Sequence, residues 1–168
     1  MQYICGYETP VGFDDMMMSS DGEVLTGLWF EHSQDSAHHS MLVPNKADLP
    51  IFDRTRQWLD IYYSGHQPDF VPQYSIGEAT PFRREVSDIM MSIPFGETMT
   101  YGEIAGIIAD RHGIARMAAQ AVGGAVGWNP ICIIVPCHRV LGAAGKLTGY
   151  GGGMHNKIAL LRLEGHNL

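Results

Sequence analysis

The sequence predicts an α+β protein in which a small mixed α/β part precedes a helical part. Runs of β-branched and aromatic residues typical of strands occur before residue 31, whereas three segments with helically spaced apolar residues follow one another after residue 80. Between them lies a polar stretch with two prolines, residues 66–79, which is typical of a linker. We therefore expect an N-terminal domain with its linker at residues 1–79 and a C-terminal domain at residues 80–168.

The N-terminal part is expected to form a small sheet with one helix. Residues 3–7 and 24–30 are predicted strands, and a Ser-Asp-Gly turn precedes the second of them. A helix follows, because apolar residues recur at helical spacing until Gly65 and Pro68 end the pattern. The positions that form this pattern are Ile51, Thr55, Trp58, Leu59 and Tyr62.

Three helices are predicted in the C-terminal part. The first has Thr80 as its N-cap with a proline directly after it, and the second begins at a capping box of Thr100 and Glu103. The third, at about residues 115–126, consists of small residues, and its glycines suggest that another backbone approaches closely. Helix, short turn and helix outline a helix-turn-helix, although many such hairpins only pack within their own domain. The apolar positions of the first two helices are Phe82, Val86, Ile89, Met90 and Ile93, and Ile104, Ile107 and Ile108.

A cysteine that follows the last predicted strand is the candidate nucleophile. The apolar run at residues 131–135 is expected to form a buried strand that Pro136 ends, and Cys137 comes next. The neighbouring His138 is a candidate base, and the charge of Arg139 would favour the thiolate. Because neighbours on an extended chain point apart, contact between the thiol and the imidazole requires a bend or a bridging water.

A third group would have to orient the imidazole of His138. Glu164 is the only acidic residue after Asp110, and so it is the candidate for that role. Alternatively Cys137 is a buried structural thiol, as most free cysteines are, and Cys132 inside the apolar run is expected to be one. Three cysteines without CxxC spacing indicate neither a disulfide framework nor an all-cysteine zinc site, and they fit a reducing compartment.

Charge and hydropathy indicate whether the sequence fits a nucleic-acid-binding, a membrane or a secreted protein. Residues 1–110 carry five Lys or Arg against seventeen Asp or Glu, a net charge of −12, whereas residues 111–168 carry six against one, a net charge of +5. A basic face is compatible with phosphate contacts, which depend on the local field, although chance segregation would give the same charges. Without a membrane-length apolar run or a secretory signal, we expect a cytoplasmic protein, by default a monomer.

Neither a metal nor a cofactor is indicated. His38 and His39 are adjacent, so they point to different faces of a strand or helix, and no nearby cysteine or aspartate completes a ligand set. We expect them to be exposed loop histidines and the methionines at residues 16–18 to fill the core.

The run NPICIIVPCHRV, residues 129–140, closely resembles the active-site signature of the O6-alkylguanine-DNA alkyltransferases, also called methylated-DNA–protein-cysteine methyltransferases. Further blocks match this family on both sides of the run. They are residues 80–82, 93–98, 100–105, 121–125, 147–153 and 160–165. The resemblance is dense over about residues 80–165 and weaker earlier, and its length makes it highly specific.

The resemblance implies a ribonuclease H-like N-terminal domain and a winged-helix-like C-terminal domain with a DNA-binding helix-turn-helix. It implies that an O6-alkylguanine, and by extension an O4-alkylthymine, is flipped out of double-stranded DNA into a pocket. Cys137 would then take the alkyl group irreversibly and the protein would be consumed. His138 would be linked to the thiol through a water and held by Glu164, while Asn129 would brace the turn around the thiol.

The resemblance also implies which residues contact DNA and the base. Tyr101 would protonate the guanine and crowd the rotated phosphate, backbone groups near Val140 and the glycines after Tyr150 would form the base pocket, and the third helix would enter the minor groove. The full implied set is Tyr101, Arg116, Gln120, Ala121, Gly123, Arg139, Val140, Tyr150 and Gly151.

Two positions depart from the family pattern. Gln120 stands where an arginine commonly fills the gap left by the flipped base, so we expect weaker DNA affinity or slower flipping, with Arg116 one turn earlier as a candidate substitute. Ser87 stands where a tryptophan is usual, which concerns packing between the domains rather than the chemistry.

Three other functions are compatible with parts of the sequence. A non-repairing sensor of alkylated bases would lack the cysteine that is present here as Cys137. A cysteine hydrolase would show turnover and would leave the helix-turn-helix unexplained. A transcription factor would bind a specific DNA sequence, and loss of the cysteine would not affect that binding.

Overall fold

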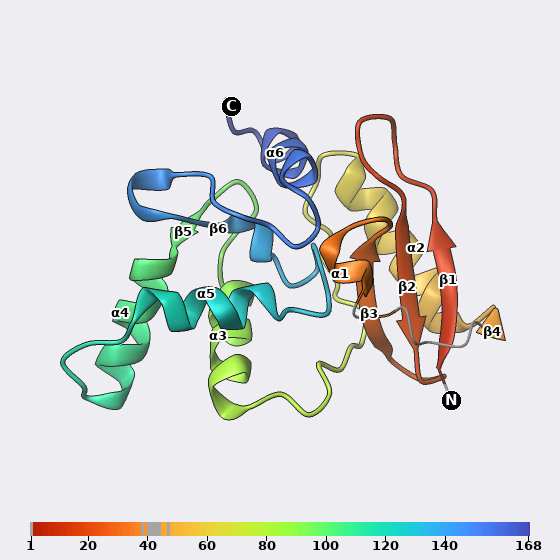
Figure 1. Cartoon of the computed structure of the whole chain (residues 1–168). Helices are drawn as coiled ribbons and strands as arrows, with labels where there is room; N and C mark the ends of the chain where they lie inside the picture. Colours follow the sequence, from red (N-terminus) through yellow and green to blue (C-terminus); the bar gives the residue numbers. More distant parts are fainter. Residues whose placement is uncertain (1, 38, 40–44, 47) are drawn as a thin grey trace.

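The computed structural model describes residues 2–37, 39, 45–46 and 48–168. A sheet-bearing half and a helical half lie side by side and share one hydrophobic core (Figure 1). The first histidine of the adjacent pair considered above, His38, lies outside the described residues. None of the helices in the described part of the chain combines the length and apolarity needed to cross a membrane.

The N-terminal half is built on a four-stranded sheet in the order β3-β2-β1-β4. β1 pairs antiparallel with β2 and β2 with β3, whereas β4 runs parallel to β1. Helix α2 lies across one face of this sheet, and the short helix α1 lies at its border with the helical half (Figure 1). The elements are β1 (Tyr3–Tyr7), β2 (Met16–Ser20), β3 (Leu25–Phe30), α1 (Gln34–Ala37), β4 (Asn45–Lys46) and α2 (Pro50–Tyr63).

The C-terminal half consists of four helices and two very short strands. Strands β5 and β6 pair in parallel, and α5 packs against α3 and α4. Single 3-10 turns precede and follow β6. The elements are α3 (Pro81–Met91), β5 (Met99–Thr100), α4 (Tyr101–His112), α5 (Ala119–Gly127), η1 (Cys137–Arg139), β6 (Val140–Leu141), η2 (Ala143–Gly145) and α6 (Met154–Leu163).

Most of the predicted helical pattern is confirmed. All five apolar positions expected in α2 are buried, and Thr80 and Thr100 accept N-cap hydrogen bonds at 3.2 and 3.0 Å from the backbone N–H groups three residues on. In α3 and α4 only Phe82 and Ile107 are half-buried instead of buried. Helical spacing therefore located these helices because one face of each is covered by the common core.

The apolar run at residues 131–135 does not form the predicted strand. Every residue in it is buried as expected, but only isolated bridges join Ile131 to Leu28 and Cys132 to Val135. Ile133 has a left-handed φ of 70°, which turns the chain back on itself. A short apolar run cannot by itself distinguish a strand from a buried loop, and here neighbouring elements decide.

The third predicted helix begins later than expected. Gly113 ends α4 in a left-handed conformation, and α5 begins only at Ala119 instead of about residue 115. Met117 in the connection packs against the core, and Ala118 has an extended backbone. The two helices still contact each other across this turn, so the helix-turn-helix outline remains.

Three further features of the N-terminal half were not predicted. β2 and β4 were missed, and the predicted linker is not free, because Leu25 N–H donates to Gln73 O and Ser75 N–H donates to Leu25 O, both at 2.9 Å. His39, expected to be an exposed loop residue, is half-buried with its ring stacked on Trp29 at a centroid distance of 3.8 Å. Tertiary packing, which local sequence does not encode, places all three.

Candidate active site

The loop that carries Cys137 is held by the side chain of Asn129. Its amide nitrogen donates to Val135 O at 2.9 Å and to Ile131 O at 3.2 Å, while its oxygen accepts from Ile131 N–H at 3.0 Å. These bonds satisfy three backbone groups that are buried with the loop, and they fix its two ends together. The structure thus brings Asn129 to the turn around the thiol.

Cys137 is the first residue of the 3-10 turn η1, and His138 follows it within the same turn. Pro136 precedes it with φ −82° and ψ 64°, and Cys137 N–H donates to Val135 O at 2.8 Å. This bend lets Cys137 line a pocket while His138, fully buried, points into the core. The turn therefore does not bring the thiol and the imidazole into contact, and of the two possibilities that the sequence left open only a bridging water could link them.

Glu164 connects the histidine to the rest of the core. Its carboxylate accepts a 2.6 Å bond from His138 Nε2 and bonds of 2.8 and 3.2 Å from Arg139. Tyr62 from α2 donates its hydroxyl to the same carboxylate at 2.6 Å, and Gly96 N–H donates at 3.1 Å. A buried carboxylate with this many donors is charged and fixed in position.

The acidity of both groups follows from these contacts. Burial alone would raise the pKa of Glu164, but the hydrogen bonds and charges of His138 and Arg139 outweigh it and hold this pKa well below its usual range. Burial lowers the pKa of His138, against the opposing effect of Glu164, so the imidazole is neutral at pH 7 and carries its charge only at the lower pH at which Glu164 itself titrates. A neutral imidazole is the form that can act as a base.

The bond to Glu164 also fixes the tautomer of His138. An ionised carboxylate only accepts, so Nε2 carries the proton and Nδ1 carries the lone pair. Nδ1 is buried and has no hydrogen-bond partner among the described residues. The basic nitrogen of the imidazole is therefore available to a proton from another source.

The thiol of Cys137 is more acidic than an ordinary cysteine. Interaction with the Cys132 thiol lowers its pKa, burial opposes this, and the Asn129 and Tyr150 side chains lower it further. The pKa of Cys132 is raised well above its usual range by the same interaction and by burial. Of the two thiols, Cys137 therefore has the lower pKa, which favours it as the nucleophile.

A pocket of about 270 Å³ opens at Cys137. Its lining includes Tyr101 from α4 and Gly123 from α5, with Tyr150 and Gly151 on the opposite segment. Gly152, next in the chain, leaves room for the Tyr150 ring, since an added Cβ there would lie 2.6 Å from Tyr150 Cε2. Four of the nine residues expected to contact DNA or the base are brought together here.

Sequence reasoning missed residues that come from the other half of the molecule. Gln34 and Asp35 of α1 line the Cys137 pocket, and Asp35 N–H donates to Gly151 O at 3.1 Å. Tyr62 was predicted only as a core position of its helix, yet it bonds to Glu164. A tyrosine in an apolar stripe is the one signal that could have suggested a buried hydroxyl partner.

Lys157 was also missed, although it is fully buried beside the site. Its ammonium group donates to Val140 O at 2.8 Å and lies 5.8 Å from the centre of the Tyr150 ring. Burial lowers its pKa, whereas the Cys137 thiolate raises it, which means that the two charges attract. Val140, itself buried, does not line the pocket at Cys137, where it was expected to help form the base pocket, and its backbone carbonyl accepts from Lys157 instead.

Two expectations about arginines are wrong. Arg139 is 4% exposed, and its guanidinium is bound to Glu164 and to Ile93 O at 2.7 Å, so it neither reaches the surface that DNA would contact nor directs its charge at the thiol. Arg116 does not lie one helical turn before Gln120, because it precedes α5 in the extended connection. Both Arg116 and Gln120 are exposed, as is Ala121.

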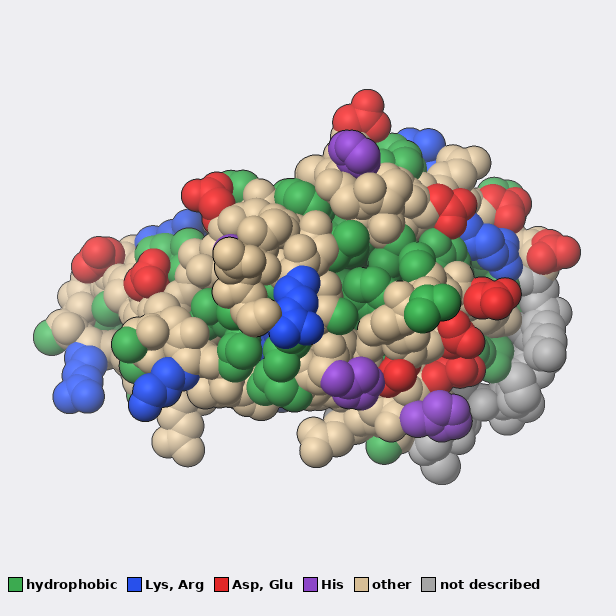
Figure 2. All heavy atoms as spheres, turned by 90° about the horizontal axis from the view of Figure 1, so that it is seen from above, with side chains coloured by type: hydrophobic (Ala, Val, Ile, Leu, Met, Phe, Trp, Pro, Cys, Tyr) green, Lys and Arg blue, Asp and Glu red, His purple; other side chains and the backbone are tan. Residues whose placement is uncertain are grey.

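Burial also corrects the charge distribution. Figure 2 shows acidic side chains gathered over the end of the molecule that the sheet forms, whereas at the helical end lysine and arginine side chains lie among fewer acidic ones. Two of the six basic residues after position 110, Arg139 and Lys157, are buried, so the positive surface is smaller than the sequence suggested. Arg111, Arg116, Lys146 and Arg162 are the exposed members.

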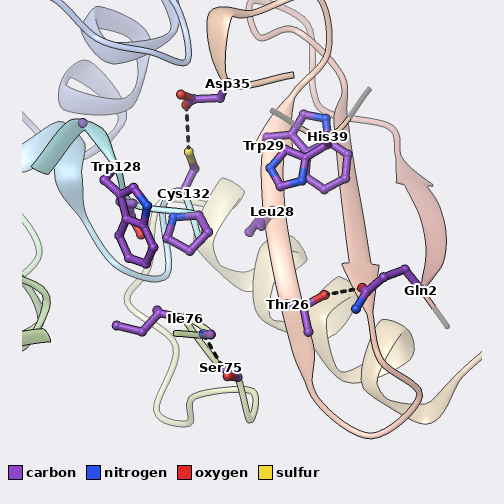
Figure 3. A pocket seen from close by; sticks show the side chains of 14 residues that line it. Gln2, Thr26, Leu28, Trp29, Asp35, His39, Ser75, Ile76, Trp128 and Cys132 are labelled. Atoms are coloured by element: carbon purple, nitrogen blue, oxygen red, sulfur yellow. Dashed lines mark hydrogen bonds between the residues drawn. The ribbon is translucent and has the colours of Figure 1, made fainter. Parts of the chain in front are cut away.

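A second cavity of about 340 Å³ adjoins the first, between β3 and the loop before Cys137. Trp29 with the stacked His39 forms one wall, and Trp128 faces it from the other half (Figure 3). Cys132 lies between these walls with its thiol pointing to Asp35. Asp35, Gly127 and Asn129 line both cavities.

Comparison with known proteins supplies the family. Residues 81–166 match the family model described as "6-O-methylguanine DNA methyltransferase, DNA binding domain". The chain is 41% identical over 157 residues to a methylated-DNA–protein-cysteine methyltransferase of Mycobacterium tuberculosis, which covers 94% of this chain and 88% of that protein. One from Methanosarcina mazei is 45% identical over 155 residues, covering 91% and 92%. The chain belongs to the methylated-DNA–protein-cysteine methyltransferase family.

The fold agrees with solved structures of the methyltransferase family. Mycobacterium tuberculosis OGT in complex with DNA superposes with a TM-score of 0.77 at 39% identity, covering 96% of this chain and 92% of that one. A crystal structure of the O6-methylguanine methyltransferase of the same organism also gives a TM-score of 0.77 at 39% identity, covering 98% and 93%. The mixed α/β architecture of this methyltransferase family member is therefore shared over nearly the whole chain.

Proposed function

We propose that this protein repairs DNA by direct reversal, moving the alkyl group of O6-alkylguanine, and of O4-alkylthymine, irreversibly to Cys137. The observation that carries the proposal is an acidified thiol that lines a pocket beside a neutral, carboxylate-held histidine. The names of the homologous methyltransferases and the DNA complex of a relative support it.

The chemistry uses the residues of the site in a fixed order. His138 Nδ1 accepts the Cys137 proton through a bridging water, while Glu164 holds Nε2–H. The thiolate attacks the alkyl carbon in line, the S–C bond forms and the C–O6 bond breaks with its electron pair remaining on the guanine. Tyr101 at the pocket supplies a proton to the departing base. The thioether is stable, so each molecule reacts once.

DNA contact is assigned to the exposed edge of α5. Gln120 and Ala121 are exposed there, and Gly123 leaves space beside the Tyr101 ring, with 3.9 Å between an added Cβ and the ring carbons. A helix of small residues can enter a minor groove and hold a base flipped into the pocket. We further infer a ribonuclease H-like domain at residues 1–79, a winged-helix-like domain at residues 80–168, and a monomer that acts in the cytoplasm.

Mass spectrometry of the intact protein, mixed with a duplex that contains one O6-methylguanine, tests the proposal. We expect a single added methyl group on Cys137, at most one per molecule, and none in Cys137→Ala. Cys5→Ala is the matched control, because its thiol is outside the pocket, and it should gain the methyl group as the wild type does. Tight binding to the damaged duplex without any mass gain would instead identify a sensor of alkylated bases.

A further inference from the structure

The turn between Cys132 and Cys137 brings their side chains together. Ile133 reverses the chain with its left-handed backbone, Cys132 pairs back to Val135, and Val135 O accepts the N–H of Cys137. This turn places the two cysteines side by side, and the effect of each thiol on the other lowers the pKa of Cys137 and raises that of Cys132. The second thiol is thus part of the surroundings of the nucleophile rather than an isolated core residue.

Both thiols border cavities. Cys137 lines the 270 Å³ pocket and Cys132 the adjoining 340 Å³ cavity. The Cys132 thiol donates to Asp35 Oδ2 at 3.5 Å, and Figure 3 shows this contact bridging the loop and α1. A carboxylate is therefore placed to receive the proton of Cys132.

We propose that Cys132 is a resolving thiol, which forms an intramolecular disulfide with Cys137 after a hydroperoxide has oxidised Cys137. A thiolate in an accessible pocket is the form that peroxides attack, and a neighbouring thiol is what stops the oxidation at a reversible stage. That this disulfide stops alkyl transfer to Cys137 rests on the function proposed above, whereas the formation of the disulfide itself does not.

The two steps balance without another reactant. The Cys137 thiolate attacks the distal oxygen of the hydroperoxide and the O–O bond breaks, which gives a sulfenic acid and an alkoxide, or hydroxide from hydrogen peroxide. The leaving group takes the proton that Cys137 had given to His138 and departs as an alcohol or as water. The Cys132 sulfur then attacks the Cys137 sulfur, its proton passing by way of Asp35 to the departing hydroxide, which leaves as water. Sulfur is oxidised, the peroxide is reduced, and a dithiol reverses the change.

Peptide mass spectrometry on the full chain tests this directly. After brief exposure to hydrogen peroxide and quenching with N-ethylmaleimide, trypsin releases residues 117–139, which contain both cysteines. We expect this peptide to lack two hydrogen atoms and carry no maleimide, while Cys5 remains labelled. Methyl transfer should be lost with the same time course and restored by dithiothreitol.

Variants distinguish a resolving thiol from a structural one. In Cys132→Ser and Cys132→Ala, Cys137 should progress to sulfinic acid, and dithiothreitol should no longer restore activity, expressed relative to each untreated variant. Cys5→Ser should behave as the wild type. Oxygen adducts on Cys137 with Cys132 still labelled, in the wild type, would overturn the proposal even if both variants failed to fold. Untreated wild type that transfers no methyl group would contradict only the proposed function.

Discussion

The molecule contains the same chemical pair in two environments. His138 and Glu164 are 2.6 Å apart with both side chains fully buried, whereas His155 and Asp14 are 2.7 Å apart with 64% and 42% of their side chains exposed. At nearly equal distance, water competes for the second pair and not for the first. Distance alone therefore says little about what a histidine–carboxylate contact contributes.

The two pairs also differ in what surrounds them. The buried carboxylate has donors from Arg139, Tyr62 and Gly96 besides the histidine, so its removal would leave several buried groups unsatisfied. The exposed carboxylate of Asp14 is joined to α6 by Asn156 in addition to His155. The first pair fixes a reacting group, and the second fastens the loop before β2 to the start of α6.

The largest effect is expected when the buried carboxylate loses its charge. Glu164→Gln leaves Arg139 buried without its counter-ion, which should lower the free energy of unfolding by about 3–5 kcal/mol and strongly reduce the rate of methyl transfer. Urea denaturation and single-turnover transfer would measure both. Glu85→Gln removes the half-buried partner of the exposed His112 and is the matched control, with an expected change of less than about 1 kcal/mol. Equal effects of the two substitutions would contradict the claim that burial makes the Glu164 carboxylate more important for stability than that of Glu85.

A smaller effect on the free energy of unfolding is expected from a change of pH. Both His138 and Glu164 should stabilise the fold less as the pH falls. His138 has a lowered pKa in the fold, so its contribution to stability declines as pH falls from about 6.5, the value for an unfolded chain, toward the folded pKa. Glu164 also has a lowered pKa, so its contribution is present above the unfolded value of about 4.3 and is lost as pH falls through the folded one.

Measuring the free energy of unfolding against pH would check this. The difference between wild type and Glu164→Gln should be constant near neutrality and shrink below about pH 4.3. A difference that grows below about pH 4.3 would show that the sign for Glu164 is wrong.

The smallest effect is expected at the exposed pair. The pKa of Asp14 is lowered because hydrogen bonds from His155 and Asn156 outweigh burial, but the side chain is accessible to solvent. Asp14→Asn should therefore change the free energy of unfolding by less than about 1 kcal/mol and leave methyl transfer unchanged. Thermal unfolding in low and high salt would measure it, and a loss comparable to that of Glu164→Gln would remove the distinction between the two pairs.

Local patterns explain which parts of the site could be predicted. Cys137, His138 and Glu164 were identifiable because a nucleophile, a base and the only late acid stand out in the chain. Asp35 could not be identified, because it is one of many acidic residues in the N-terminal half. Lys157 could not be identified either, because in the sequence it resembles an ordinary surface lysine. Only folding brings Asp35 to the thiol loop and removes Lys157 from water.

The sequence by itself determined the helices α2, α3 and α4, the buried character of residues 131–135 and the candidates for the reacting groups, since periodicity, caps and residue chemistry are local properties. Tertiary structure alone decided that residues 131–135 form a loop instead of a strand, and that Arg139 serves Glu164 rather than a phosphate. It also decided which of the two neighbouring thiols, Cys132 or Cys137, has a lowered pKa. Each of these outcomes depends on contacts between residues that are far apart in the chain, and local sequence patterns do not predict such contacts.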